Sequence, residues 1–226
     1  MLIRAVQKFS AVDYPGLLCG VVFTPGCNLR CPFCHNGSLV LGNEPDVREE
    51  VVFDFLETRK NKLDAVCLSG GEPLLQKGVE DFLLKVKDMG FKTKLDTNGT
   101  KPVYLEKLLK SGLVDYVAMD IKNSPARYAE TVGVKAFNLS DIYKSIEVLE
   151  ASGVEHEFRT TVTKTFHDEK SLKEAAEMIE GAPVWYLQTF RESENLIDKT
   201  VEGYSEEEMK SLYENLRKTM PFVKLR

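Results

Sequence analysis

The sequence predicts an α/β protein in which six βα units form an open, partial barrel. Two observations lead to this fold class. Short β-branched and aliphatic runs alternate with longer amphipathic runs along residues 17–190, which is the pattern of βα units around a parallel sheet. Six units are also too few to close an eight-stranded barrel, so the sheet should stay open. We expect the functional site at the carboxyl ends of the strands.

The strand candidates are apolar enough to be covered by helices. They cover residues 17–24, 64–68, 91–96, 115–121, 154–162 and 184–190. The helix candidates have apolar residues recurring three and four positions apart, as at Leu105, Leu108 and Leu109. They cover residues 47–60, 77–89, 103–111, 139–152, 169–180 and 205–218. The last helix should begin with a capping box, because Ser205 and Glu208 are three positions apart.

Composition limits the domain count and the classes of partner. A chain of 226 residues, 43% of them hydrophobic, can bury one substantial core, so residues 1–226 should form a single domain. The 30 basic and 35 acidic residues give a net charge of −5 without a basic run, which excludes nucleic acid as an expected partner. No segment approaches the roughly 18 consecutive apolar residues of a membrane span, and we expect a cytoplasmic protein without a membrane partner.

Three of the five cysteines lie within eight positions, directly after the first predicted strand. A disulfide framework would need partners spread along a short secreted chain, so a metal site is the better interpretation. Cys27, Cys31 and Cys34 can bind three irons of a 4Fe-4S cluster and leave the fourth iron open. The alternative is a zinc site with His35 as the fourth ligand, although adjacent residues seldom turn both side chains to one metal. A metal-binding module without enzymatic activity stays open at this point.

A glycine-rich turn follows the second predicted strand. Residues 69–73 read Ser-Gly-Gly-Glu-Pro. The two glycines would let the backbone approach a ligand closely, and Glu72 can accept a hydrogen bond from an ammonium group. The alternative is a plain strand-to-helix turn, with Glu72 placed favourably in the first turn of the helix.

Charged residues end the next three strands, on the side expected to carry the cysteines. Asp96 and Thr97 end the third strand, Asp120 and Lys122 end the fourth, and Arg159 lies late in the fifth. Residues two apart in a strand point to the same side, so Asp120 and Lys122 could also form a simple salt bridge.

Several of these motifs resemble a known family. The cysteine spacing, with Phe33 before the last cysteine, is similar to the signature of the radical S-adenosylmethionine (SAM) superfamily. Residues 13–16 (Asp-Tyr-Pro-Gly) and 34–36 (Cys-His-Asn) resemble the glycyl-radical-enzyme activating enzymes. Within that group the chain is most similar to the activating proteins of anaerobic ribonucleoside-triphosphate reductase, and next to pyruvate formate-lyase activating enzyme. The resemblance covers residues 9–195 and implies a TIM-like open barrel of the radical SAM type.

The resemblance also implies which residues hold the cofactors. The turn that would bind the SAM amino group consists of Gly70, Gly71, Glu72 and Pro73. The SAM carboxylate would meet Lys122 and Arg159. Phe33 and the backbone at His35 would contact the adenine. A monovalent cation would lie beside SAM on Asp96, Thr97 and Asp120. Where pyruvate formate-lyase activating enzyme has a histidine after its sixth strand, this sequence reads Phe190-Arg191, which leaves the ribose contacts and the role of Arg191 undetermined.

By resemblance, the reduced cluster would cleave SAM into methionine and a 5′-deoxyadenosyl radical. That radical would abstract the α-hydrogen of a glycine in a partner glycyl radical enzyme, anaerobic ribonucleoside-triphosphate reductase. No side chain is expected to act as a catalytic acid or base, since the cofactors carry the chemistry. The electron would come from a donor such as flavodoxin or ferredoxin. The alternatives are activation of pyruvate formate-lyase or a related lyase, and a radical SAM reaction on a small molecule.

Overall fold

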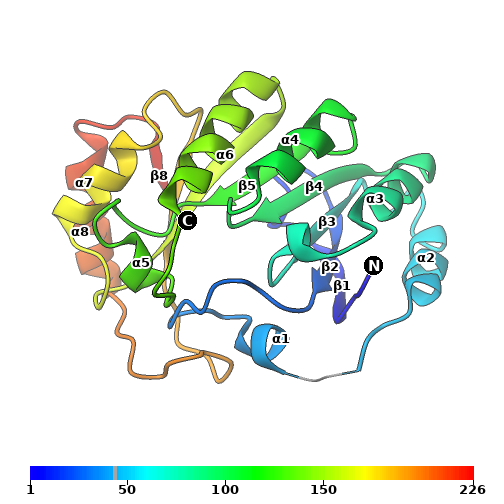
Figure 1. Ribbon diagram of the computed structural model, residues 1–226, viewed down its shortest axis with the longest axis horizontal. Helices are drawn as coiled ribbons and strands as arrows, with labels where there is room; N and C mark the ends of the chain where they lie inside the picture. Colours follow the sequence, from blue (N-terminus) through cyan, green and yellow to red (C-terminus); the bar gives the residue numbers. More distant parts are fainter. Residues whose placement is uncertain (43–44) are drawn as a thin grey trace.

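In the computed structural model, which describes residues 1–42 and 45–226, one sheet holds eight strands in the order β1 to β8 (Figure 1). The strands are β1 Ala5–Ser10, β2 Cys19–Thr24, β3 Ala65–Gly70, β4 Lys92–Thr97, β5 Tyr116–Asp120, β6 Glu155–Val162, β7 Trp185–Thr189 and β8 Val223–Leu225. The first strand runs antiparallel to β2, and every later pair is parallel. The sheet order places β1 and β8 at opposite edges, so the sheet is not closed.

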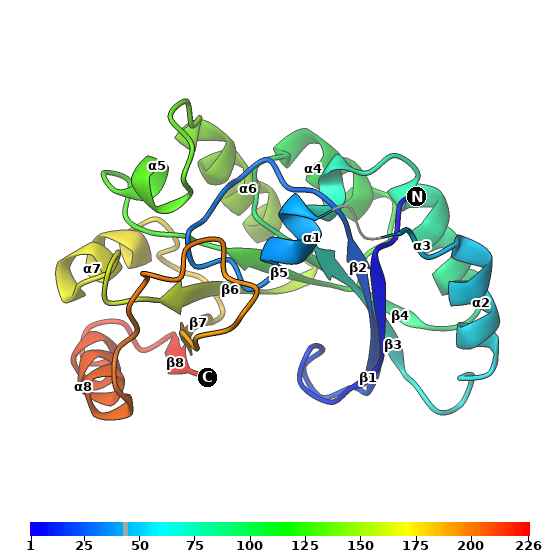
Figure 2. The ribbon, with the colours of Figure 1, turned by 90° about the horizontal axis from the view of Figure 1, so that it is seen from below.

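Helices connect the parallel strands, and Figure 2 shows α3, α4 and α6 on the outer side of the curved sheet. They are α1 Gly37–Leu41, α2 Glu49–Glu57, the 3₁₀ helix η1 Pro73–Leu75, α3 Val79–Asp88, α4 Pro102–Lys110, α5 Tyr128–Thr131, α6 Leu139–Ser152, α7 Glu169–Glu177 and α8 Glu206–Arg217. The predicted capping box is present, because the Ser205 side chain accepts from the backbone N–H of Glu208 and the Glu208 side chain accepts in return. Among the described residues, no helix is both long and apolar enough to cross a membrane.

The predicted α/β fold with an open partial barrel is confirmed. The six predicted strands are β2 to β7, and the six predicted helices are α2, α3, α4, α6, α7 and α8, with ends displaced by a few residues. Two strands were not predicted. In β1 the middle residues are exposed, and β8 has three residues, so neither edge strand carries the apolar run that marks a covered strand. One continuous sheet supports the single domain over residues 1–226, which stays a prediction.

The two faces of the sheet differ in polarity. Side chains alternate between the faces along each strand, and the outward residues such as Leu95 and Met119 pack into the main core with the helices. The inward face of β4 carries Lys94 and Asp96, beside a small apolar cluster that includes Cys67 on β3 and Tyr116 on β5. Polar side chains therefore gather on the concave face, at the carboxyl ends of the strands.

Candidate active site

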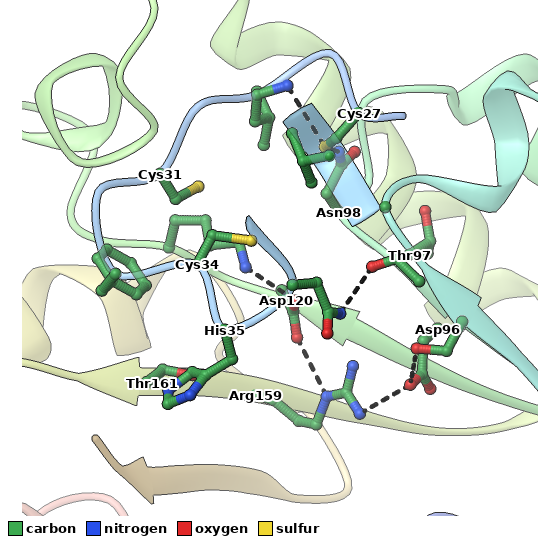
Figure 3. A pocket seen from close by; sticks show the side chains of 18 of the residues that line it. Cys27, Cys31, Cys34, His35, Asp96, Thr97, Asn98, Asp120, Arg159 and Thr161 are labelled. Carbon is green, nitrogen blue, oxygen red and sulfur yellow. Dashed lines mark hydrogen bonds and ion pairs between the residues drawn. The ribbon is translucent and has the colours of Figure 1, made fainter. Parts of the chain in front are cut away.

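The three clustered cysteines lie on the loop between β2 and α1 and open into one cavity of about 410 Å³ (Figure 3). None of the three forms a disulfide. The loop is fixed by hydrogen bonds from Cys34 N to Cys31 O (3.0 Å) and from Arg30 N to Val132 O (2.9 Å). Polar residues from the ends of β3, β4, β5 and β6 line the same cavity. The structure therefore brings together the cysteines and the strand-end residues that the sequence placed at one edge.

The chemistry of the thiols fits an iron–sulfur cluster. Burial raises the pKa of Cys31 to about 12, and the nearby Lys122 ammonium opposes this rise. Burial likewise raises the pKa of Cys27 and Cys34. The Cys27 sulfur accepts a hydrogen bond from Leu29 N at 3.4 Å. These thiols stay protonated until a metal displaces the proton and then bind it as thiolates. A hydrogen-bond donor and a cation beside them stabilise that charged form, which suits an iron–sulfur cluster.

The zinc alternative finds no support in the geometry. Within residues 1–42 and 45–226, no three His, Cys, Asp or Glu side chains are grouped as ligands of one metal ion. His35 is exposed, and its ring centroid lies 5.5 Å from that of Phe190. Thiols that bind three separate irons need not converge on one point, whereas zinc ligands must.

An asparagine that the sequence analysis missed connects the β4 turn to the cysteine loop. Asn98 Nδ2 lies 3.6 Å from Cys27 Sγ and donates to Asn28 Oδ1 at 3.0 Å. Asn28 Nδ2 donates to Thr100 Oγ1 (2.9 Å), and that hydroxyl donates to Asn98 Oδ1 (2.7 Å). The closed ring of hydrogen bonds holds Cys27 in place. The available signal was an Asn-Gly pair at the end of a strand that already carried two predicted site residues.

The glycine turn packs against the backbone at the start of the cysteine loop, and this contact takes the space that a ligand was expected to occupy. Gly71 N donates to Thr24 O and Glu72 N donates to Gly26 O, both at 2.9 Å. A Cβ at Gly71 would lie 1.8 Å from Gly26 O, and one at Gly70 would lie 2.3 Å from Thr24 N. Both glycines still line the cavity. The sequence-based reason for two glycines was thus incomplete, because they first allow β3 to meet the start of the cysteine loop.

We therefore expect Gly71→Ala to lower cluster content. The added methyl group must push Gly26 and with it the neighbouring Cys27, because a backbone oxygen cannot yield as a flexible side chain can. Iron and sulfide per chain after anaerobic reconstitution measures the effect, and we expect less than about half of the wild-type value. Gly20→Ala is the control, since Gly20 has no left-handed backbone conformation and a Cβ there makes only ordinary contacts, the nearest at 3.6 Å. Full cluster content in Gly71→Ala would contradict the steric argument.

Glu72 lies beneath the cavity, outside its lining. The side chain is fully buried. Its Oε1 accepts from Leu74 N (3.1 Å) and Thr97 Oγ1 (2.9 Å), and its Oε2 accepts from Asn98 N (2.7 Å). Pro73, also buried, is the first residue of η1, and Glu72 caps that helix. The predicted contact of Glu72 with an ammonium group stays a prediction, and the geometry favours the alternative of a capped strand-to-helix turn.

The buried carboxyl of Glu72 predicts a pH-dependent stability. Burial raises the pKa of Glu72 from its usual value of 4.5 to about 7. A carboxyl group whose pKa is higher in the folded than in the unfolded protein adds to the free energy of unfolding. This contribution is complete at a pH below the pKa of the unfolded state, and it is lost as the pH rises through the pKa of the folded state. The free energy of unfolding of wild type should therefore fall relative to Glu72→Gln between about pH 5 and pH 8. Urea unfolding at both ends of this range measures the difference, and a constant difference would count against it.

Five charged side chains form an alternating chain, and all of them except Lys94 line the cavity. Arg159 lies between two carboxylates, 3.3 Å from Asp96 and 3.1 Å from Asp120 (Figure 3). Asp96 also pairs with Lys94, and Asp120 lies 2.8 Å from Lys122. The salt bridge considered as the simple alternative for Asp120 and Lys122 is thus present. Within this chain of pairs three cations face two anions, and the carboxylate of Asp13, which also lines the cavity, balances the remaining positive charge.

These groups stay charged at neutral pH. Burial alone would raise the pKa of Asp96, but the charges of Arg159 and Lys94 outweigh it and lower the pKa to about 2. For Lys122, burial opposes the charged form, and the charge of Asp120 outweighs it and raises the pKa. An ionised, mutually paired set of this kind is pre-organised to hold a charged ligand.

Lys122 and Phe33 are held from behind by the loop after β6. His167 is buried, and its Nε2–H donates to Lys122 O at 2.8 Å while Nδ1 accepts from Thr163 N at 3.1 Å. Burial lowers the pKa of His167 to about 4, so the ring stays neutral. The Phe33 ring lies 5.9 Å from Phe166 and 6.1 Å from His167, between centroids. Phe33 lines the cavity, and one side of its ring packs on these rings; its predicted contact with the adenine stays a prediction.

The fold has known counterparts. The chain superposes on the crystal structure of Streptococcus suis SuiB with a TM-score of 0.71 and 17% sequence identity, over 91% of this chain and 48% of SuiB. It therefore spans about half of the length of that protein. At this level of identity the likeness concerns the fold alone.

Sequence comparison reaches further. A protein of Methanocaldococcus jannaschii that is assigned by name to the glycyl-radical enzyme activating enzymes is 35% identical over 196 residues, 84% of this chain and 80% of that protein. Pyruvate formate-lyase-activating enzyme of Clostridium pasteurianum is 31% identical over 187 residues, 79% of this chain and 76% of that enzyme. The model of the Radical SAM superfamily matches residues 21–182. The chain therefore belongs to the radical SAM superfamily and, within it, to the family of glycyl-radical enzyme activating enzymes.

Proposed function

We propose that this enzyme binds a 4Fe-4S cluster through Cys27, Cys31 and Cys34, binds SAM in the adjoining cavity, and removes the α-hydrogen of a glycine in anaerobic ribonucleoside-triphosphate reductase. Membership of the radical SAM superfamily implies the cluster and SAM. When bound, they supply the electron and the 5′-deoxyadenosyl radical of the reaction. The observation that carries the proposal is that three free thiols and the cations Lys122 and Arg159 line one cavity.

The side chains of the cavity suit the parts of SAM. The cations Lys122 and Arg159 can pair with the carboxylate, and each keeps its orientation through its pair with Asp120. Phe33 and His35 line the cavity, and the Phe33 ring and the backbone at His35 suit the adenine. No group in this assignment needs to transfer a proton, so the chain's task is to bind, orient and exclude water.

The open sheet supports a protein as the second substrate. The edges β1 and β8 are not paired with each other, so the concave face is not enclosed by strands on that side (Figure 2). An opening of this kind leaves a path by which a loop of a partner protein can reach the concave face. We infer that the partner presents its glycine on such a loop, and that flavodoxin or ferredoxin supplies the electron.

Two other reactions compete with this proposal. The relative from C. pasteurianum is named for pyruvate formate-lyase, so that lyase is the first alternative partner. A small-molecule substrate is the second. The cytoplasmic location stays a prediction. The predicted monovalent cation on Asp96, Thr97 and Asp120 is untested, and the pairing of these side chains within the chain argues against it.

The test is anaerobic reconstitution with iron and sulfide, followed by reduction in the presence of SAM. We expect 5′-deoxyadenosine in proportion to the cluster content. Purified anaerobic ribonucleoside-triphosphate reductase or pyruvate formate-lyase is then added, and electron paramagnetic resonance detects the glycyl radical. A radical on the reductase alone supports the proposal. A radical on the lyase alone would show that pyruvate formate-lyase, and not the reductase, is the partner.

Two further outcomes separate the remaining readings. Product without a radical on either protein points to another substrate. A protein that binds cluster and SAM but forms no 5′-deoxyadenosine, with either partner present, would overturn the proposed chemistry. Reductase lacking its radical glycine, replaced by alanine, is the matched control and should carry no glycyl radical.

A further inference from the structure

Lys94 occupies an unusual position for a lysine. It lies in the middle of β4, and its side chain is 1% exposed. Its strand neighbours in the register are Cys67 on β3 and Tyr116 on β5. Both belong to the small apolar cluster on the concave face, which also contains Cys19 and Tyr14. An ammonium group in such surroundings is unfavourable unless it is paired, so its presence needs a specific partner.

The partner is the carboxylate of Asp96. Lys94 Nζ contacts Asp96 Oδ1, and its other polar neighbour is Cys67 Sγ at 3.7 Å. Asp96 Oδ2 is used as well, since it accepts from Ser69 Oγ at 2.9 Å and pairs with Arg159 at 3.3 Å. Both oxygens of this carboxylate therefore already have positively charged partners from the chain itself.

The second carboxylate of the predicted cation site is occupied in the same way. Asp120 Oδ1 pairs with Arg159 at 3.1 Å and Oδ2 with Lys122 at 2.8 Å. Thr97 Oγ1 is directed to Glu72 at 2.9 Å. A metal cation placed here would meet three cations and two anions, and would have to displace one of the chain's own partners from each oxygen that it used. The residues therefore do not fit a further cation.

We propose that the Lys94 ammonium is a tethered cation that takes the place of a monovalent metal ion at Asp96. This inference rests on the proposed SAM site. A covalently attached ammonium neutralises Asp96 at all times, so that carboxylate does not repel the SAM carboxylate and needs no ion from solution. SAM binding by this enzyme is then independent of the kind of monovalent cation in the buffer.

The experiment measures the dissociation constant of SAM by equilibrium dialysis with the cluster-loaded enzyme under anaerobic conditions. Each protein is tested at equal ionic strength in chloride salts of K⁺, Na⁺ or choline, the last being too large to fit beside a carboxylate. Wild type should bind SAM equally, within about twofold, in all three salts. Lys94→Met should bind about tenfold more weakly in choline, the loss of one charge-assisted contact, and should recover in K⁺ or Na⁺.

Lys92→Met is the matched control, because Lys92 lies on the same strand with its side chain exposed. It should behave as wild type in every salt. Lys94→Gln keeps a polar but uncharged side chain, one bond shorter than lysine, and replaces Lys94→Met if that variant does not fold. The wild-type comparison needs no variant at all.

Two results would overturn the inference alone: wild type that loses SAM affinity in choline, which means that an ion binds beside Lys94, or Lys94 variants with unchanged affinity in every salt. Wild type that binds no SAM in any salt, despite a full cluster, would overturn the proposed function and this inference together. The two failures are thus distinguishable from the same set of titrations.

Discussion

Cys31→Ala should lose the cluster and SAM cleavage together. Two remaining thiolates cannot hold the three irons that the loop is arranged to bind, and the electron donor to SAM is lost with the cluster. We expect no visible absorption of an iron–sulfur cluster after reconstitution, and 5′-deoxyadenosine below about a thousandth of the wild-type rate. The measurements are iron and sulfide per chain and a product assay under reducing conditions.

The matched control for this change is Cys19→Ala. Cys19 is fully buried and Cys31 nearly so, but Cys19 lies in β2 on the concave face, outside the cavity lining. The control should keep its cluster and lose only a little stability through the missing sulfur atom. A Cys31→Ala protein that still forms 5′-deoxyadenosine would refute the assignment of this residue as a ligand.

Arg159→Met should destabilise the fold as well as weaken SAM binding. Arg159 separates two carboxylates, and its side chain is 13% exposed. Removing the guanidinium leaves Asp96 and Asp120 facing each other with one partner fewer each, and breaking a buried pair of this kind costs about 3 kcal/mol or more. Urea unfolding of the loaded enzyme measures the change in the free energy of unfolding.

A second substitution tests the cause. In Arg159→Met/Asp96→Asn the repulsion is removed, so the double variant should lose at least about 1 kcal/mol less than the sum of the two single losses. Arg127→Met, which breaks a more exposed pair with Asp168, should cost less than about 1 kcal/mol. A loss of similar size in Arg127→Met and Arg159→Met would show that the charged chain has no special weight in stability.

Long apolar runs made most of the fold predictable. Covered parallel strands need continuous apolar residues, and the helices that cover them need an apolar stripe, so both patterns are local in sequence. The edge strands β1 and β8 were not predicted, because one edge of each is unpaired and such a strand needs fewer apolar residues. The short helices α1 and α5 have too few residues to display a period.

The candidate site was predictable in location and less so in detail. The cysteine spacing and the polar residues at strand ends identified the edge of the sheet, because parallel strands bring their carboxyl ends together. Glu72 shows the limit of this reasoning. Its type suggested a ligand contact, whereas the structure turns both oxygens toward protein donors, two of them on the neighbouring β4 turn.

The sequence by itself determined which functional groups follow each strand: three thiols after β2, a glycine turn after β3, and acidic and basic residues at the ends of the next strands. Only the tertiary structure decided which of these groups meet. Asn98 and Cys27 are 71 positions apart, and Arg159 and Asp120 are 39 apart. Their contacts depend on the register between strands and on the face to which each side chain points, and a shift of one residue would reverse that face.

Lys94 illustrates the same division. In the sequence it is a single lysine within a predicted strand, without a signal of function. The register places it beside Cys67 and two residues before Asp96 on the concave face, where the surrounding apolar residues make an unpaired charge too costly. Local sequence determines which elements form, because it fixes the backbone and the apolar pattern. Which charged residues pair with one another depends on which of them the folded sheet buries side by side.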